Sequence, residues 1–123
     1  MEVVILLAHG SRADAALDAH RRLAISVADG TGLTVLPAFL EMAEPNLSSA
    51  IDRAVREGAE HVTVLPHFLA PGNHVGRDIP ALVDSARERH PGLRITLADY
   101  TGNRPEMLHT VVAAANAAIN PTS

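Results

Sequence analysis

The sequence contains no cysteine, and this absence removes several classes of site. Disulfides, thiolate-bound metals and cysteine nucleophiles are excluded, so any metal must be bound through imidazole or carboxylate groups. Aromatic residues make up only 2% of the chain and tryptophan is absent, which argues against a stacking surface for nucleic acid. The formal net charge of −4 also provides no basic footprint for such a partner.

Long apolar runs are missing as well. The longest of them have about six residues, whereas a helix that crosses a membrane needs about 20. Met1 and Glu2 lead directly into an apolar segment with no basic region before it, so we expect no leader peptide and a cytoplasmic location. The 123 residues are 47% hydrophobic and 20% charged, the balance of an ordinary globular protein, and we expect one domain over residues 1–123.

Four short apolar segments alternate with four amphipathic ones along the chain. The expected strands cover 3–8, 33–36 running into 37–40, 62–65 and 93–98, and the expected helices begin near 16, 44, 78 and 107. This alternation predicts an α/β fold, a four-stranded parallel sheet with helices on both faces. The first strand is apolar without alternation, as in a central strand, whereas the fourth alternates and is expected at an edge.

Turn and capping residues set the expected limits of these elements. Asp29–Gly32 is expected to end the first helix, and Gly58 the second. Pro66 is expected to stop the third strand because proline cannot donate to the ladder. Asp78 offers a capping carboxylate for the third helix, with Pro80 in its first turn. The stretch before it is expected to be a loop.

Two histidines are expected at one edge of the sheet. His9 directly follows the first strand, and His74 lies between the third strand and the third helix. In the flavodoxin-like strand order 2-1-3-4, these strands are neighbours and their carboxyl ends line a ligand-binding crevice. Imidazole binds cobalt, nickel, iron and zinc, and it also accepts protons near neutral pH. Two loop histidines hydrogen-bonded to backbone are the alternative, which the flanking glycine and turn residues disfavour.

Four other residues are weaker candidates for the same crevice. Glu41 stands just past the second strand, where it is either a third metal ligand or a solvated loop residue. Ser11 and Arg12 follow Gly10 where the first helix begins, an arrangement that suits an anion but is common in loops. His67 follows Pro66, and for it a packed histidine is the favoured interpretation. The remaining histidines are expected to be structural or on the surface: His20, His61, His90 and His109.

Nucleotide binding has no motif in this sequence. Neither GxGxxG nor GxxxxGK[ST] occurs, and no arrangement of serine, histidine and aspartate indicates a hydrolytic triad. The residues by themselves therefore leave three functions open: a metal-dependent enzyme, a carrier that binds metal or a ligand without turnover, and a regulatory module with no small ligand. The clustered histidines disfavour the third.

Three motifs, in this order, resemble one known family. They are HGSR at 9–12, AFLEMAEPNL at 38–47 and LPHFLAPGNHVGRDIP at 65–80, and together they resemble the short CbiX form of the sirohydrochlorin chelatases. The resemblance covers about residues 3–98 and weakens at 99–102, where mainly Gly102 is kept. It implies a flavodoxin-like chelatase fold and a homodimer, since longer chelatases resemble two such halves in one chain.

The resemblance also implies an activity and a set of site residues. The activity is ATP-independent insertion of a divalent metal into sirohydrochlorin, in the biosynthesis of cobalamin or siroheme. Cobalt is the first expectation for the metal, with iron and nickel as the other candidates, and no nucleotide is required. By position in the motifs, His9, His74 and Glu41 carry metal binding and catalysis. Ser11, Arg12 and His67 are then candidates for binding the tetrapyrrole.

Overall fold

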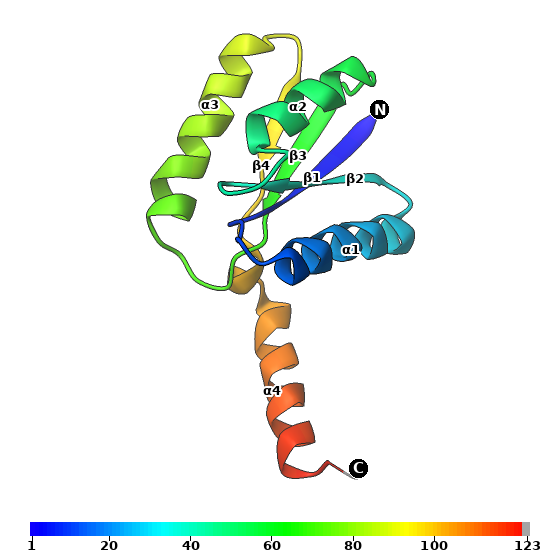
Figure 1. Ribbon diagram of the computed structural model, residues 1–123, viewed down its shortest axis with the longest axis vertical. Helices are drawn as coiled ribbons and strands as arrows, with labels where there is room; N and C mark the ends of the chain where they lie inside the picture. Colours follow the sequence, from blue (N-terminus) through cyan, green and yellow to red (C-terminus); the bar gives the residue numbers. More distant parts are fainter. Residues whose placement is uncertain (122–123) are drawn as a thin grey trace.

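Four parallel strands form one sheet in the order β2-β1-β3-β4, which confirms the predicted topology. The protein was analysed as a computed structural model that describes residues 1–121 (Figure 1). The strands are β1 (Glu2–Ala8), β2 (Thr34–Phe39), β3 (His61–Pro66) and β4 (Arg94–Leu97). The helices are α1 (Asp14–Thr31), α2 (Leu47–Arg56), α3 (Ile79–Arg89) and α4 (Pro105–Ile119), with a short π-helix η1 (His74–Asp78) and a 3-10 helix η2 (Thr101–Asn103).

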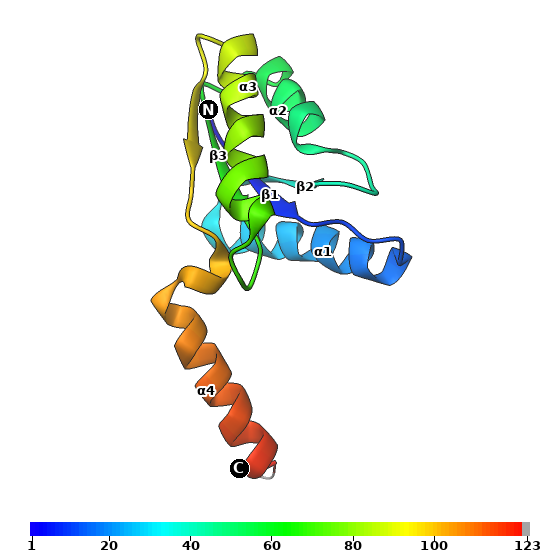
Figure 2. The same ribbon diagram turned by 90° about the vertical axis from the view of Figure 1, so that its left-hand side faces the viewer.

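The main core lies between the sheet and the helices α2 and α3. Alternate residues of the central strands point into it, and Ile5, Val62 and Val64 are fully buried there. The apolar stripe of α2 packs against this face, with Ile51 also fully buried. Helix α1 covers the opposite face where β1 and β2 lie (Figure 2). The two faces therefore differ in cover, because two helices pack on one and one helix on the other.

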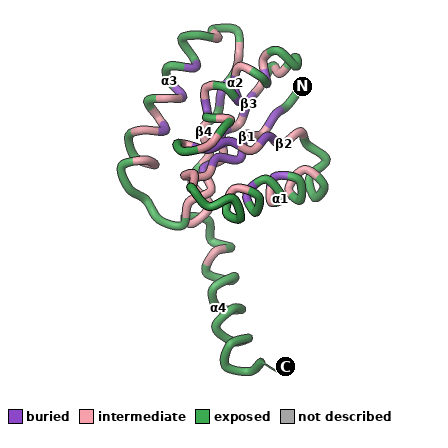
Figure 3. The backbone as a smooth tube through the Cα atoms, viewed as in Figure 1, coloured by how far each residue is buried: buried purple, intermediate pink, exposed green. Residues whose placement is uncertain are grey.

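The last helix packs on neither face of the sheet. Figures 1 and 2 show α4 running away from the body of the molecule beyond β4, and Figure 3 shows it exposed along its length. The prediction of helices on both faces is confirmed, but through α1, α2 and α3 alone. No helix within residues 1–121 is long and apolar enough to cross a membrane.

The ends of α1 and β2 lie close to the predicted ones. Helix α1 ends within the predicted stretch Asp29–Gly32, at Gly32, which has a left-handed φ of 73° that favours glycine. Gly30 remains helical, at a cost of about 1 kcal/mol relative to alanine. Strand β2 includes Pro37, and because β2 is at an edge of the sheet, the missing N–H is tolerated there.

Candidate metal site

The first element of the site is the end of β1, where His9 leaves the sheet. The backbone ladder between β1 and β2 continues one step past the strands, since Leu40 N–H donates to the Ala8 carbonyl at 2.8 Å. Glu41 N–H then donates to the His9 carbonyl at 3.0 Å. This extended pairing places the Glu41 side chain beside the His9 ring, although 31 residues of intervening chain separate them in sequence order. The distance between the His9 and Glu41 side chains is therefore set by backbone hydrogen bonds that continue the β1–β2 pairing.

Gly10 makes this close approach of the two loops feasible. Its φ of 108° is in the region that side chains rarely adopt, and a Cβ at this position would lie 1.8 Å from the Glu41 carbonyl oxygen. Only glycine satisfies both constraints without moving the loop after β2. The glycine of the HGSR motif is therefore required by the packing of Glu41 against the end of β1.

His74 comes from a helical turn and not from the loop that the sequence predicted. It opens the π-helix η1, and the Ile79 N–H donates to the His74 carbonyl, so that the turn continues directly into α3. The carboxylate of Asp78 was predicted to cap α3, but it makes no side-chain capping bond. Instead, His74 Nδ1 lies 3.0 Å from Asp78 Oδ2. The π-helical turn places His74 and Asp78 on the same face, so that their side chains can pair.

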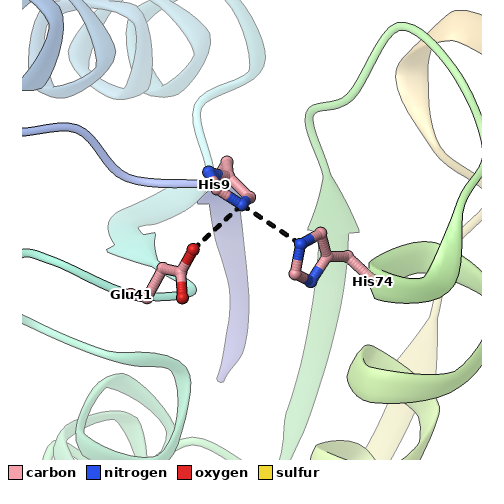
Figure 4. A group of neighbouring side chains, drawn as sticks. All are labelled: His9, Glu41 and His74. Carbon is pink, nitrogen blue, oxygen red and sulfur yellow. Dashed lines mark hydrogen bonds and ion pairs between the residues drawn. The ribbon is translucent and has the colours of Figure 1, made fainter.

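Three side chains from three different segments converge at this edge of the sheet (Figure 4). His9 Nε2 lies 3.2 Å from His74 Nε2 and 3.1 Å from Glu41 Oε1. One ligand atom from each residue lies within 4.8 Å of the others. Ligands that share a divalent ion at about 2.1 Å are themselves roughly 3.0–3.4 Å apart, so these separations match a shared ion.

The tautomer of His74 follows from its partner Asp78. Because a carboxylate only accepts, His74 Nδ1 carries the proton that it donates to Asp78, and its Nε2 is left with a lone pair. In Figure 4, this Nε2 atom points toward His9 Nε2. A carboxylate behind a ligating histidine fixes the tautomer and orientation of the ring. Asp78 therefore positions His74 as a ligand, although the sequence analysis had assigned it only a capping role.

The site is accessible from solvent. The side chains of His9, Glu41 and His74 keep 41%, 52% and 44% of their exposure, respectively. The ring of Phe68 lies edge-on to that of His9, with 6.4 Å between centroids, and forms an apolar wall on one side. Three protein ligands leave further coordination positions open toward solvent, where a second molecule can reach the ion.

The candidates for anion binding lie beside the three side chains but are not part of the cluster. Ser11 Oγ accepts a hydrogen bond from the Ala13 N–H at 3.0 Å, a turn that leads into α1. Arg12 is exposed at the same loop. His67 Nδ1 pairs with Thr101 Oγ1 at 3.0 Å, and its ring stacks toward His20. His67 is thus engaged in packing, the interpretation that the sequence analysis favoured.

The other histidines have partners that agree with structural or surface roles. His20 is buried, and its Nε2 donates to the Leu6 carbonyl at 2.8 Å. Burial lowers the pKa of His20 below its ordinary value, so that it is held neutral. His90 Nε2 lies 2.7 Å from Asp52 Oδ1, and this hydrogen bond lowers the pKa of the Asp52 carboxyl. His109 is exposed on α4.

Asp78 is the site residue that sequence reasoning missed. A usable signal was present, since a histidine and an aspartate four positions apart share one face of a helical turn. The signal was lost because the segment before α3 was expected to be a loop. In a loop, a spacing of four residues does not indicate that the side chains of His74 and Asp78 point the same way.

Comparison with known proteins shows which family the chain resembles along most of its length. The family model described as CbiX matches residues 3–118. A sirohydrochlorin cobaltochelatase of Priestia megaterium is 32% identical over 108 residues, which are 88% of this chain and 35% of that protein. A sirohydrochlorin cobaltochelatase of Saccharolobus solfataricus is 31% identical over 95% of both chains. The chain thus spans about a third of the first relative and nearly all of the second.

Two solved structures are similar over almost the whole chain. A CbiX protein of Marinobacter aquaeolei, described as a putative cobalamin biosynthesis protein, has 30% identity and a TM-score of 0.87, and the alignment covers 99% of this chain and 100% of that one. The sirohydrochlorin chelatase SirB of Bacillus subtilis, in complex with cobalt, has 25% identity and a TM-score of 0.85. The second alignment covers 94% of this chain but only 50% of SirB.

Proposed function

Because the chain belongs to the CbiX family, we propose that it inserts a divalent metal into sirohydrochlorin without using ATP. The observation that carries the proposal is the convergence of His9, Glu41 and His74 within 4.8 Å at the carboxyl edge of the sheet. The metal is a substrate of this reaction and not a resident cofactor. A site for such an ion must bind it firmly enough to strip water, yet leave open positions for the ring nitrogens.

The reaction exchanges one metal dication for two pyrrole protons. His9 and His74 hold the incoming ion through their Nε2 atoms, and Glu41 adds a negative charge that two neutral imidazoles lack. As the ring nitrogens displace the remaining waters, the two N–H bonds break and the metal–nitrogen bonds form. The released protons pass to Glu41 or to an imidazole as it leaves the metal, and then to water. Asp78 keeps His74 in the required tautomer throughout.

Cobalt is the metal that we propose first, with iron and nickel as alternatives. Nitrogen and oxygen ligands bind all three ions in the Irving–Williams order, so the donor set alone does not choose among them. The Priestia and Saccharolobus relatives are named for cobalt, and the SirB structure contains it. Initial rates with the three ions at equal free concentration will rank them and will separate a role in cobalamin synthesis from one in siroheme synthesis. A cytoplasmic location stays a prediction.

The substrate carries several carboxylates, whereas the protein has a formal net charge of −4. We propose that Arg12 and Arg77 offset this repulsion at the two sides of the crevice. Arg12 follows the end of β1, and Arg77 lies on η1 with a side chain that is 76% exposed. Guanidinium groups pair with carboxylates in a bidentate manner, which suits peripheral acid groups of a flat ring.

We propose that the working form is a homodimer. The hollow beside His9, between the end of β1 and α1, has a volume of about 130 Å³. Pockets for ligands of drug size hold about 300–1,000 Å³, and a tetrapyrrole is larger than most drugs. One copy therefore supplies a wall with three ligands, and a second copy supplies the opposite wall. The twofold length of SirB relative to this chain supports the same arrangement within one polypeptide.

The test measures turnover with cobalt and sirohydrochlorin in excess over protein, followed by absorption spectroscopy. Wild type is expected to convert many equivalents, while His9→Ala and His74→Ala fall to the uncatalysed rate because each removes a ligand. His90→Ala, a surface histidine paired with Asp52, is the matched control and is expected to retain full activity. Conversion that stops at one equivalent per site identifies a carrier instead. Wild-type rates in both site variants contradict the mechanism.

A further inference from the structure

Two exposed apolar residues flank the metal site. Met42 directly follows the ligand Glu41, and it is 52% exposed. Leu69, which is 73% exposed, directly follows Phe68, whose ring lies edge-on to that of His9. Because β1 lies between β2 and β3, these two residues belong to loops on opposite sides of the strand that ends at His9. An apolar side chain is therefore available on each side of the site.

The backbone of Met42 has an unusual conformation. Among residues 1–121, Met42 is the one non-glycine residue with a positive φ, which is 66°. Glycine adopts this conformation without strain, whereas a residue with a side chain rarely does. Strained residues persist where their surroundings fix them, and they cluster at ligand sites. Burial within the chain does not offset the strain at Met42, since about half of the residue is exposed.

Hydrogen bonds on two sides fix the loop that carries Met42. On one side, the Glu41 N–H donates to the His9 carbonyl at 3.0 Å. On the other, the Phe39 N–H donates to the Pro45 carbonyl at 2.9 Å and closes the base of the loop. A fixed backbone restricts where the Met42 side chain can lie, and this lowers the entropy that a ligand must overcome when it contacts that side chain.

The backbone at Leu69 is fixed as well. The Gly102 N–H in η2 donates to the Phe68 carbonyl at 2.8 Å. A Cβ at Gly102 would lie 1.9 Å from the Leu69 carbonyl oxygen, so that η2 and the loop after β3 are in close contact there. Both exposed apolar residues are therefore held by a packed backbone.

The shape and polarity of a tetrapyrrole match this arrangement. An ion bound by His9, Glu41 and His74 enters the centre of the ring, so one face of the ring must lie over these residues and extend past them on both sides. That face is an apolar π surface, whereas the carboxylates of the substrate lie at its periphery. Neighbouring strands are about 4.8 Å apart, which places the ends of β2 and β3 roughly 10 Å apart, comparable with the width of the ring.

We propose that Met42, with Leu69 on the other side of His9, contacts the face of the macrocycle and holds it over the bound ion. This inference rests on the proposed function and names the part of the substrate, its apolar ring face, that these residues recognise. A methionine side chain is flexible and polarisable, and its sulfur makes favourable contacts with aromatic systems. Met42 is then a substrate-contact residue and not a ligand of the metal.

Nuclear magnetic resonance of the methionine methyl groups tests the contact directly. The chain has three methionines, Met1, Met42 and Met107, so ¹³C-methyl labelling gives three signals, and Met42→Leu assigns one of them. When metal-free sirohydrochlorin is added, the ring current is expected to shift the Met42 signal upfield. The Met1 signal, from the opposite edge of the sheet, is expected to stay in place. An unshifted Met42 signal in a saturated complex overturns the proposal.

A matched set of substitutions tests the contact in turnover. Met42→Asn keeps the backbone, because asparagine adopts a left-handed conformation more readily than most residues, but it removes the apolar side chain. The KM for sirohydrochlorin is expected to rise by about 10-fold, with kcat and the dissociation constant for Co²⁺ alone unchanged. Met42→Leu is expected to recover most of this loss. Ile25→Asn, at a residue of α1 that is 62% exposed, is the control and is expected to leave all three values unchanged.

The other outcomes separate this inference from its alternatives. A wild-type KM in Met42→Asn contradicts it. Weaker Co²⁺ binding in Met42→Asn without macrocycle means that Met42 only positions Glu41, and a change in mass by light scattering means that it contacts a second copy; either result contradicts it. Because the methyl shifts are measured without metal, a protein that shows the Met42 shift but inserts no metal refutes only the proposed function. Metal insertion without that shift refutes only this inference.

Discussion

The two ends of the sheet each bring histidine and glutamate together, but only the carboxyl end leaves ligand atoms facing one another. At the amino end, His61 Nδ1 pairs with Glu2 Oε2 at 2.8 Å and its Nε2 pairs with Thr96 Oγ1 at 2.7 Å. Arg94 adds a positive charge beside the same ring. At the carboxyl end, His74 uses only Nδ1 for its carboxylate, and its Nε2 points toward His9.

The histidines at the carboxyl end of the sheet are also more exposed to solvent than the histidine at the amino end. The His61 side chain is 17% exposed, whereas those of His9 and His74 are 41% and 44% exposed. A histidine beside a carboxylate is therefore not by itself a metal ligand. It becomes one when one nitrogen is held by a partner and the other is left with a lone pair that points to a shared, accessible position. The four predictions below test this difference, beginning with the largest expected effect.

Gly10→Ala is expected to disrupt the carboxyl end most strongly. The added Cβ meets the Glu41 carbonyl and the residue must keep a positive φ, so we expect a loss of about 3 kcal/mol in the free energy of unfolding. Urea denaturation measures it. Gly30→Ala is the control, because nothing lies within 4 Å of its Cβ position inside α1, and it is expected to stabilise by about 0.5–1 kcal/mol. Equal effects of both substitutions would contradict the packing argument.

Glu41→Ala and Glu2→Ala compare the two glutamates directly. Loss of Glu41 removes a ligand and a neutralising charge, so the dissociation constant for Co²⁺ is expected to rise by about 100-fold. Loss of Glu2 removes a partner of His61 at the other end and is expected to leave that constant unchanged. Isothermal titration calorimetry with the two variants decides. A similar loss of affinity in both would mean that general charge, and not the site, holds the ion.

Asp78→Asn tests whether the hydrogen bond at His74 Nδ1 is needed for metal binding through Nε2. The amide can present either a donor or an acceptor to Nδ1, so the tautomer is no longer fixed, and we expect about a 10-fold loss of Co²⁺ affinity. Asp78→Glu is expected to recover part of the loss, because it restores a carboxylate with less suitable reach. Asp52→Asn, at the His90 pair, is the control and should bind Co²⁺ like wild type. No loss in Asp78→Asn would assign that residue to packing alone.

The smallest expected effect is a pH dependence of the free energy of unfolding. It comes from His20 on α1, which belongs to neither of the two histidine–glutamate groups. Its pKa in the folded protein lies below the ordinary value of 6.5 because the ring is buried, so the unfolded chain binds more protons between the two values. The free energy of unfolding therefore rises with pH through this range and falls as the solution is acidified below about pH 6.5. His20→Gln is expected to flatten this slope in urea titrations at several pH values, and exposed His109→Gln is not.

The sequence predicted the sheet well because its signals are local. An apolar run followed by turn residues determines a strand wherever it lies, and four such runs alternating with helices leave few parallel topologies. It also placed His9 and His74 at neighbouring strand ends, since the carboxyl ends of parallel strands share one edge. Gly30 inside α1 and Pro37 inside β2 are unfavourable residues that these elements tolerate, and the predicted ends of both elements lie close to the observed ones.

The contacts that complete the site were harder to predict for a physical reason. The pairing of Asp78 with His74 depends on a π-turn, and no residue pattern distinguished that turn from a loop. The place of Glu41 depends on one extra step of ladder hydrogen bonding and on the positive φ of Gly10. Both are set by the paths of two chain segments relative to each other, which the sequence of either segment does not contain.

The sequence alone determined the order of the elements, the exclusion of thiolate chemistry and the two histidines at one edge, because each depends on residue type and short-range spacing. The tertiary structure alone decided which histidine nitrogen keeps a lone pair and where α4 points. Those features depend on hydrogen bonds and close contacts between distant segments, such as Asp78 with His74 and Gly102 with Phe68 and Leu69. An apolar stripe predicts that a helix will be covered, and only the direction of the chain decides by what.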